Sequence, residues 1–119
     1  MRIVLDTNFL VDCIRFKIDI KSELAGNEIF LTDQILFEIE KITERKTKES
    51  SLAKLALGYI KRKGLKILKS KGRNADESLI VYSKNGYAIA THDKVLKNKI
   101  KRAGGKVIFI RQKRYVVFE

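Results

Sequence analysis

The chain opens on Arg2-Ile3-Val4-Leu5-Asp6-Thr7-Asn8-Phe9-Leu10, and this stretch decides its fold class. Three consecutive apolar residues, Ile3 to Leu5, are typical of a strand that is buried on both faces. Asp6 ends the run, and the apolar residues after it recur at helical spacing as far as Phe16. Since a buried strand followed directly by a helix is the repeating unit of parallel sheets, the stretch predicts an α/β protein.

Short apolar runs and helical patterns go on alternating along the rest of the chain. Strands are predicted at residues 2–5, 28–31, 65–68, 87–90 and 106–110, with residues 115–118 as a further edge strand. Helices are predicted at residues 8–16, 33–45, 50–63, 75–84 and 94–103, and a short helix ending at Gly26 fits residues 17–27. We therefore expect a mostly parallel sheet of about five strands, sandwiched between helices.

The length of 119 residues favours a single domain over residues 1–119, because the chain is too short to build a second independent core. No apolar run is long enough to span a bilayer, and no export signal follows Met1. Cys13 has no partner for an internal disulfide. These features predict a cytoplasmic protein that does not associate with membranes.

Charge is the strongest feature of the composition. The formal net charge is +12, and residues 61–73 and 94–114 contain many basic side chains and no acid. Such segments attract a polyanion, and nucleic acid is the expected partner. The alternative is a lysine-rich surface of the thermophile type, although those surfaces balance Lys with Glu and this chain does not.

Two aspartates follow predicted strands. Asp6 comes directly after the first strand, and Asp93 follows the fourth strand and Thr91-His92. In parallel α/β sheets the functional crevice lies beyond the carboxyl ends of the strands. Each aspartate would also serve well as the N-cap of the next helix, which is the alternative. Their common location at strand ends favours a functional site.

Further acids lie on the predicted helices. On a helical wheel Asp76 falls on the stripe expected to face the sheet, among Leu79, Ile80 and Ser83. Favourable interaction with the helix dipole is the alternative for this first-turn acid. Glu77 follows Asn74 at the spacing of a capping box and is assigned to capping. Glu38 lies at the edge of an apolar stripe, where acids are usually solvated.

Acids are rare in the second half of the chain. From residue 60 onward there are seventeen Lys or Arg and only four acids, which are Asp76, Glu77, Asp93 and Glu119. Clustered carboxylates need cations, and oxygen ligands with few His or Cys favour Mg²⁺ or Mn²⁺ over Zn²⁺. His92 is the only histidine, which argues against a His-based metal site.

Other α/β enzymes would need residues that this chain lacks. A haloacid-dehalogenase-like phosphatase needs a second Asp two residues after the first, where Asn8 stands. Neither glycine-rich phosphate motif, G-x-x-x-x-G-K-[ST] or G-x-G-x-x-G, occurs. A receiver domain would need a phospho-accepting Asp after a middle strand, and residues 65–69 end without an acid.

Four pieces of the sequence together resemble the PIN-domain nucleases over essentially the whole chain. They are Ile3-Val4-Leu5-Asp6-Thr7-Asn8-Phe9-Leu10, Glu38, Asn74-Ala75-Asp76-Glu77-Ser78-Leu79-Ile80 and Ala90-Thr91-His92-Asp93-Lys94-Val95-Leu96. The resemblance implies a three-layer α/β/α fold whose catalytic acids bind Mg²⁺ or Mn²⁺, namely Asp6, Glu38, Asp76 and Asp93. It implies Thr7, Asn8 and Thr91 as supporting residues. His92 departs from the Asn that is common at its position in one branch.

The implied activity is hydrolysis of RNA phosphodiester bonds, with the basic segments following the RNA backbone. The candidate RNA contacts are Lys97, Lys101, Arg102, Arg111, Lys113 and Arg114. Residues 110–118 look like archaeal relatives of small-subunit rRNA-processing PIN proteins, whereas VapC-like toxins share the same four acids. The implied partners are accordingly a pre-ribosomal particle or an antitoxin, with a homodimer as the assembly.

Two further classes of function stay open. A PIN-like module that holds RNA or a ribosomal partner without cutting fits the same fold, and so does a structural subunit of an RNA-processing assembly. Four intact acids argue against a module that has lost catalysis. The sequence therefore predicts a metal-dependent endoribonuclease.

Overall fold

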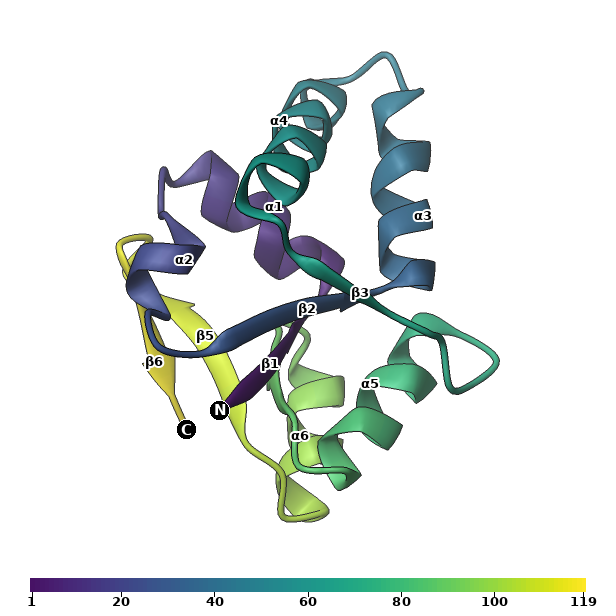
Figure 1. Ribbon diagram of the computed structural model, residues 1–119, viewed down its shortest axis with the longest axis vertical. Coiled ribbons are helices and arrows are strands. Elements are labelled where there is room, and N and C mark those ends of the chain that lie inside the picture. Colours follow the sequence, from purple (N-terminus) through teal and green to yellow (C-terminus); the bar gives the residue numbers. More distant parts are fainter.

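The computed structural model describes residues 1–119 as six strands and six helices (Figure 1). The strands are β1 (Arg2–Leu5), β2 (Glu28–Thr32), β3 (Lys66–Leu68), β4 (Ala88–Ala90), β5 (Val107–Arg111) and β6 (Tyr115–Phe118). The helices are α1 (Thr7–Arg15), α2 (Ile20–Glu23), α3 (Asp33–Thr43), α4 (Lys48–Lys63), α5 (Ala75–Lys84) and α6 (Lys94–Arg102). None of the helices has the length and apolar character needed to cross a bilayer.

All six strands belong to one sheet, in the order β3-β2-β1-β4-β5-β6. β1 pairs in parallel with β2 on one side and with β4 on the other, and only β6 runs antiparallel, against β5. Figure 1 shows α1, α3 and α4 on one side of the sheet and α5 and α6 on the other. The predicted α/β/α fold with a mostly parallel sheet is confirmed, and the edge strand is its sixth member.

The central strands supply the middle of the hydrophobic core. Ile3, Val4 and Leu5 of β1 and all three residues of β4 are fully or almost fully buried, as expected for strands covered by helices on both faces. They join one cluster of 28 buried apolar residues that includes side chains of both helical layers. Each buried Leu or Ile stabilises the fold by about 1.5–3 kcal/mol. Because β1 and β4 lie in this core, their packing holds the carboxyl ends of both strands in place.

The predicted boundaries of the longer helices and of the strands lie within two residues of the observed ones. Gly64 ends α4 at φ 63°, the left-handed conformation in which glycine commonly terminates helices. The prediction that a short helix reaches Gly26 is wrong. α2 stops at Glu23, and a turn closed by the hydrogen bond from Asn27 N–H to Leu24 carbonyl oxygen occupies the residues up to β2.

Candidate active site

Strand order places the site at the carboxyl edge of the sheet, between β1 and β4. From β1 the chain builds the sheet outward to β2 and β3 on one side, and then to β4, β5 and β6 on the other. Such a reversal of strand order leaves a crevice beyond the strand ends, where ligands of open α/β sheets bind. Asp6 follows β1 and Thr91 follows β4, so both lie at this reversal.

Asp6 is the most enclosed of the predicted acids. Its Oδ1 accepts a 2.8 Å hydrogen bond from Thr7 N–H, and its Oδ2 accepts one of 2.8 Å from the Thr91 hydroxyl. Burial raises the pKa of the Asp6 carboxyl; the two hydrogen bonds oppose this, and the charges of Asp76 and Glu38 add to the rise. The charges of Glu38 on α3 and Asp76 on α5 therefore reach Asp6 at this edge of the sheet.

Glu38 reaches the site from the middle of α3. The Thr7 hydroxyl donates a 2.7 Å hydrogen bond to Glu38 Oε2, which ties α3 to the start of α1. Thr7 and Thr91 thus contact the acids that they were predicted to support. Asn8, the third predicted support, is exposed on α1 and makes no side-chain hydrogen bond in the structure.

Asp76 enters from the first turn of α5. Asn74 caps this helix by accepting a 2.9 Å hydrogen bond from Glu77 N–H. The Ser78 hydroxyl donates to Gln34 Oε1 at 2.8 Å, and this bond ties the start of α5 to the start of α3. Asp76 is exposed, so the prediction that it faces the sheet is wrong. The first turn of α5 lies at the carboxyl edge of the sheet. A residue there can lie on the side of the helix that faces the sheet and still border an open pocket, as Asp76 does.

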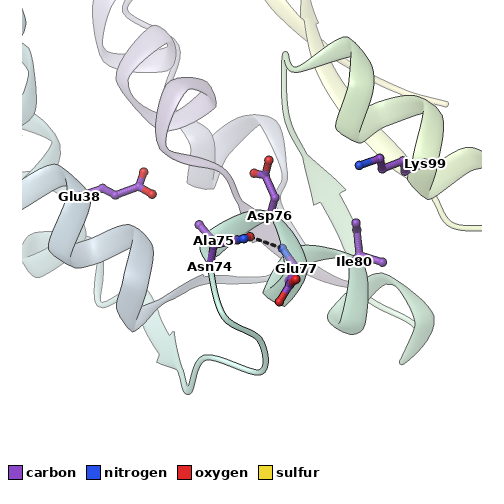
Figure 2. A pocket seen from close by; sticks show the side chains of 7 residues that line it. All are labelled: Glu38, Asn74, Ala75, Asp76, Glu77, Ile80 and Lys99. Carbon is purple, nitrogen blue, oxygen red and sulfur yellow. Dashed lines mark hydrogen bonds between the residues drawn. The ribbon is translucent and has the colours of Figure 1, made fainter.

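Half of the capping box predicted for Asn74 and Glu77 is present: Asn74 accepts from Glu77 N–H, but the Glu77 side chain binds Arg73 and not Asn74 N–H. Glu77 Oε2 accepts a 2.7 Å hydrogen bond from Arg73 N–H, and the Arg73 guanidinium pairs with its Oε1 at 3.1 Å. The backbone N–H and then the guanidinium of Arg73 lower the pKa of this carboxyl. Figure 2 shows the Glu77 side chain directed away from Asp76.

These elements enclose a pocket of about 440 Å³, lined by Glu38, Asn74, Ala75, Asp76, Glu77, Ile80 and Lys99. Its size lies within the range of roughly 300–1,000 Å³ that is usual for ligand sites. In Figure 2, Glu38, Asp76 and Lys99 extend toward the same open space from α3, α5 and α6. The pocket therefore offers carboxylates on two walls and one ammonium group on a third.

Asp93 stands apart from the other three acids. It is exposed and caps α6, and its Oδ1 accepts hydrogen bonds from the N–H groups of Val95 at 2.9 Å and Leu96 at 3.1 Å. Its backbone N–H donates to the Thr91 hydroxyl oxygen at 3.1 Å, which links it to Asp6 through one side chain. The N-cap role is thus present, while Oδ2 accepts no hydrogen bond from the protein.

The carboxylates do not converge on a single point. No three of them lie close enough in this arrangement to coordinate one cation together. Like charges favour separated side-chain conformations. Asp6 is held by two hydrogen bonds and Glu38 by one, whereas Asp76 is exposed and its carboxylate accepts no hydrogen bond from the protein. An oxygen-only donor set of this kind fits Mg²⁺ or Mn²⁺.

His92 belongs to a packing network rather than to the pocket. Its Nδ1 lies 2.8 Å from Asp12 Oδ2, and its Nε2 accepts a 3.3 Å hydrogen bond from Ile110 N–H. Because Nε2 is the acceptor, the neutral ring carries its proton on Nδ1 and donates it to Asp12. Arg15 pairs with Asp12 in turn. The ring thus joins the end of β4 to α1 and β5.

Several of the predicted RNA contacts are engaged within the protein. Lys97 pairs with Glu119 at 3.0 Å and lies over the Phe109 ring at 4.1 Å, and Lys101 pairs with Glu119 as well. Lys101 and then Lys97 lower the pKa of the Glu119 carboxyl to about 2. Two more contacts lie over rings, Arg111 over Phe109 and Lys113 over Phe16. Arg102 and Arg114 make no ion pair or ring contact.

Known proteins resemble this chain in sequence and in fold. A family model described as a PIN-like domain matches residues 3–113. Ribonuclease VapC4 of Methanocaldococcus jannaschii is 36% identical over 124 residues, which cover 96% of this chain and 93% of that protein.

Solved structures show the same fold. The PIN domain endonuclease Utp24 superposes with a TM-score of 0.81 at 25% identity, covering 99% of this chain and 90% of its own. A domain of a functionally unknown protein from Methanocaldococcus jannaschii superposes with a TM-score of 0.66 at 16% identity, covering 92% of this chain and 91% of its own.

Proposed function

This chain belongs to the PIN-domain family, whose relatives here are a ribonuclease and an endonuclease, and we propose that it is a metal-dependent endoribonuclease. The proposed reaction is hydrolysis of RNA phosphodiester bonds with Mg²⁺ or Mn²⁺. One observation carries the proposal: Thr7 hydrogen-bonds both Asp6 and Glu38 beside the crevice between β1 and β4, and Glu38 lines one pocket together with Asp76.

Asp6, Glu38 and Asp76 would hold the cation, and Asp93 would join them as the fourth acid through its free Oδ2. When bound, the cation supplies the positive charge that lowers the pKa of an attacking water and stabilises the leaving oxygen. Thr91 and Thr7 keep Asp6 and Glu38 in place through their hydroxyl groups. The protein therefore contributes carboxylates, of which Asp6 and Glu38 are held by hydrogen bonds, and no side chain has to act as the general base.

The activity is tested with a single-stranded RNA that carries a different label at each end. We expect internal cuts in millimolar Mn²⁺ or Mg²⁺ and intact RNA in EDTA, because the carboxylates alone repel the phosphate. RNA that stays whole in both metals while it remains bound to the protein would support the non-catalytic module instead.

Two biological roles fit this activity. The identity with ribonuclease VapC4 favours the VapC-like branch and with it the toxin of a toxin–antitoxin pair, whereas the resemblance of residues 110–118 to rRNA-processing PIN proteins favours a role in processing ribosomal RNA. The corresponding partners are an antitoxin or a pre-ribosomal particle, and a homodimer and a cytoplasmic location belong to the same proposal. A small acidic reading frame beside the gene would favour the toxin.

The tip of the β5–β6 hairpin is a proposed contact for the RNA backbone. Gln112 and Lys113 form its turn with φ of 54° and 56°, a conformation that costs non-glycine residues about 1–2 kcal/mol each. β-strand pairing from Ile108–Phe118 to Arg111–Tyr115 holds the turn in place. The basic side chains at this tip are therefore presented on a defined surface.

We predict that replacing Arg102 and Arg114 together with Gln weakens RNA binding and its salt dependence. Both side chains are free of internal partners, so the change removes phosphate contacts and no packing. Two lost contacts should lower the slope of log affinity against log salt by about 1.4 for a single strand. Fluorescence anisotropy at several salt concentrations measures the slope. Lys54→Gln, on the exposed face of α4, removes a charge outside both basic segments and should leave the slope unchanged.

A further inference from the structure

Lys99 stands on the wall of the pocket opposite to the acids. It projects from α6, whereas Glu38 and Asp76 project from α3 and α5, and Figure 2 shows its ammonium group directed toward the space beside Asp76. Sequence analysis grouped Lys99 with the other basic residues of 94–114 and did not single it out.

The charge of Lys99 is not used elsewhere in the protein. Lys97 and Lys101 lie four residues apart on the same face of α6, and both pair with Glu119. Lys99 lies about 200° around the helix from each of them, toward α5, and it forms no ion pair. Lys97 and Lys101 therefore form ion pairs on one face of α6, and Lys99 has an unpaired ammonium group on the other face.

An ammonium group beside a cluster of carboxylates is unfavourable for the proposed cation. Two positive charges in one pocket repel each other, and this would weaken metal binding unless an anion lies between them. A phosphate group that enters the pocket would meet the cation on one side and the ammonium on the other. Lysine suits this role because its three donors rotate freely around a compact charge.

We propose that Lys99 binds a non-bridging oxygen of an RNA phosphate in the pocket and so positions the RNA against the acids. This inference rests on the proposed endoribonuclease function and adds a substrate contact to it. Ile80 and Ala75 are the apolar residues of the pocket lining, and Lys99 forms no ion pair with the pocket carboxylates, which in the proposed complex are bound to the cation.

The test compares Lys99→Gln, Lys99→Arg and Lys84→Gln. Lys84 ends α5, eight residues from Asp76, and is exposed without an ion pair, so its replacement removes the same charge away from the pocket. We expect Lys99→Gln to lower kcat/KM for a single-stranded RNA on the order of 10- to 100-fold. Lys99→Arg should recover much of the loss, and Lys84→Gln should match the wild type.

The second readout is Mn²⁺ affinity without RNA, measured by calorimetric titration. Loss of a nearby positive charge should leave Mn²⁺ binding to Lys99→Gln as tight as in the wild type, or tighter. A variant that merely damages the pocket would lose Mn²⁺ and RNA together, and this result would overturn the inference. Cleavage by Lys99→Gln at the wild-type rate would overturn it as well while leaving the endoribonuclease proposal intact. A wild-type protein that binds no Mn²⁺ and cuts no RNA would refute both.

Discussion

Replacing Asp6 with Asn should lower RNA cleavage on the order of a thousandfold, since a few kcal/mol of transition-state stabilisation depend on the cation that this carboxylate helps to hold. The amide still offers an oxygen to Thr7 N–H and an N–H to the Thr91 oxygen, so the start of α1 keeps its shape. Glu38→Gln, Asp76→Asn and Asp93→Asn should each cause a comparable loss. Single-turnover cleavage in saturating Mn²⁺ measures the effect.

The acids act as one unit in this account, so their losses should not add. Asp6→Asn combined with Asp76→Asn should be little worse than Asp6→Asn alone. Glu77→Gln is the matched control, because its side chain points away from Asp76 and an amide oxygen can still accept the hydrogen bond from Arg73 N–H. Wild-type activity in Asp6→Asn, or additive losses in the double variant, would contradict a shared cation.

A substitution of Asp93 distinguishes between its two possible roles, which are N-cap of α6 and ligand of the cation. As the N-cap of α6, it accepts hydrogen bonds from Val95 and Leu96 N–H through Oδ1, and the amide oxygen of Asn can replace these. Asp93→Asn should therefore keep the stability of the protein and lose activity if the free Oδ2 serves the cation. If Asp93→Asn keeps its activity, Asp93 serves only as the N-cap of α6.

The second large effect is stabilisation by metal. A cation that binds the folded chain and not the unfolded chain should stabilise the protein by about 2.7 kcal/mol at a hundredfold excess over its Kd. For a domain of this size the melting temperature should rise by roughly 10 °C, and EDTA should reverse the rise. Differential scanning calorimetry in Mn²⁺ and in EDTA measures it. Equal melting temperatures in both would argue strongly against the site.

The raised pKa of Asp6 gives the metal-free protein a pH dependence of known sign. As pH rises from the ordinary value of 3.8 to the raised pKa, the folded state keeps a proton that the unfolded state has lost, so this carboxyl's contribution to stability falls. Asp6→Asn does not titrate. In EDTA, urea unfolding should therefore show Asp6→Asn gaining stability relative to the wild type between acid and neutral pH.

Sequence alone placed the acids that follow strands correctly, because strand ends are set by local apolar runs. Ile3 to Leu5 and Ala88 to Ala90 are buried as predicted, and Asp6 and Asp93 follow at the carboxyl edge. The helical wheel wrongly predicted that Asp76 faces the sheet. Periodicity indicates which side of α5 faces inward, but it does not indicate that the first turn of the helix borders an open pocket. The single domain and the remaining roles of the site residues stay predictions.

The contacts that organise the site depend on tertiary structure and were beyond sequence patterns. Thr7 and Glu38 lie 31 positions apart in the chain, and only the packing of α1 against α3 brings them within 2.7 Å. The pairing of Lys97 and Lys101 with Glu119 is likewise decided by where β6 ends. A sequence that shows only a run of lysines therefore does not reveal that Lys99 alone faces the pocket.

The central claim is that the carboxylates around Asp6 bind a divalent cation, and calorimetric titration of Mn²⁺ into wild type, Asp6→Asn and Glu77→Gln tests it most directly. The account predicts saturable binding to the wild type and to Glu77→Gln, and loss of that binding in Asp6→Asn while its circular dichroism spectrum stays native. Equal Mn²⁺ binding by Asp6→Asn and the wild type, or no binding by any of the three proteins, would contradict it.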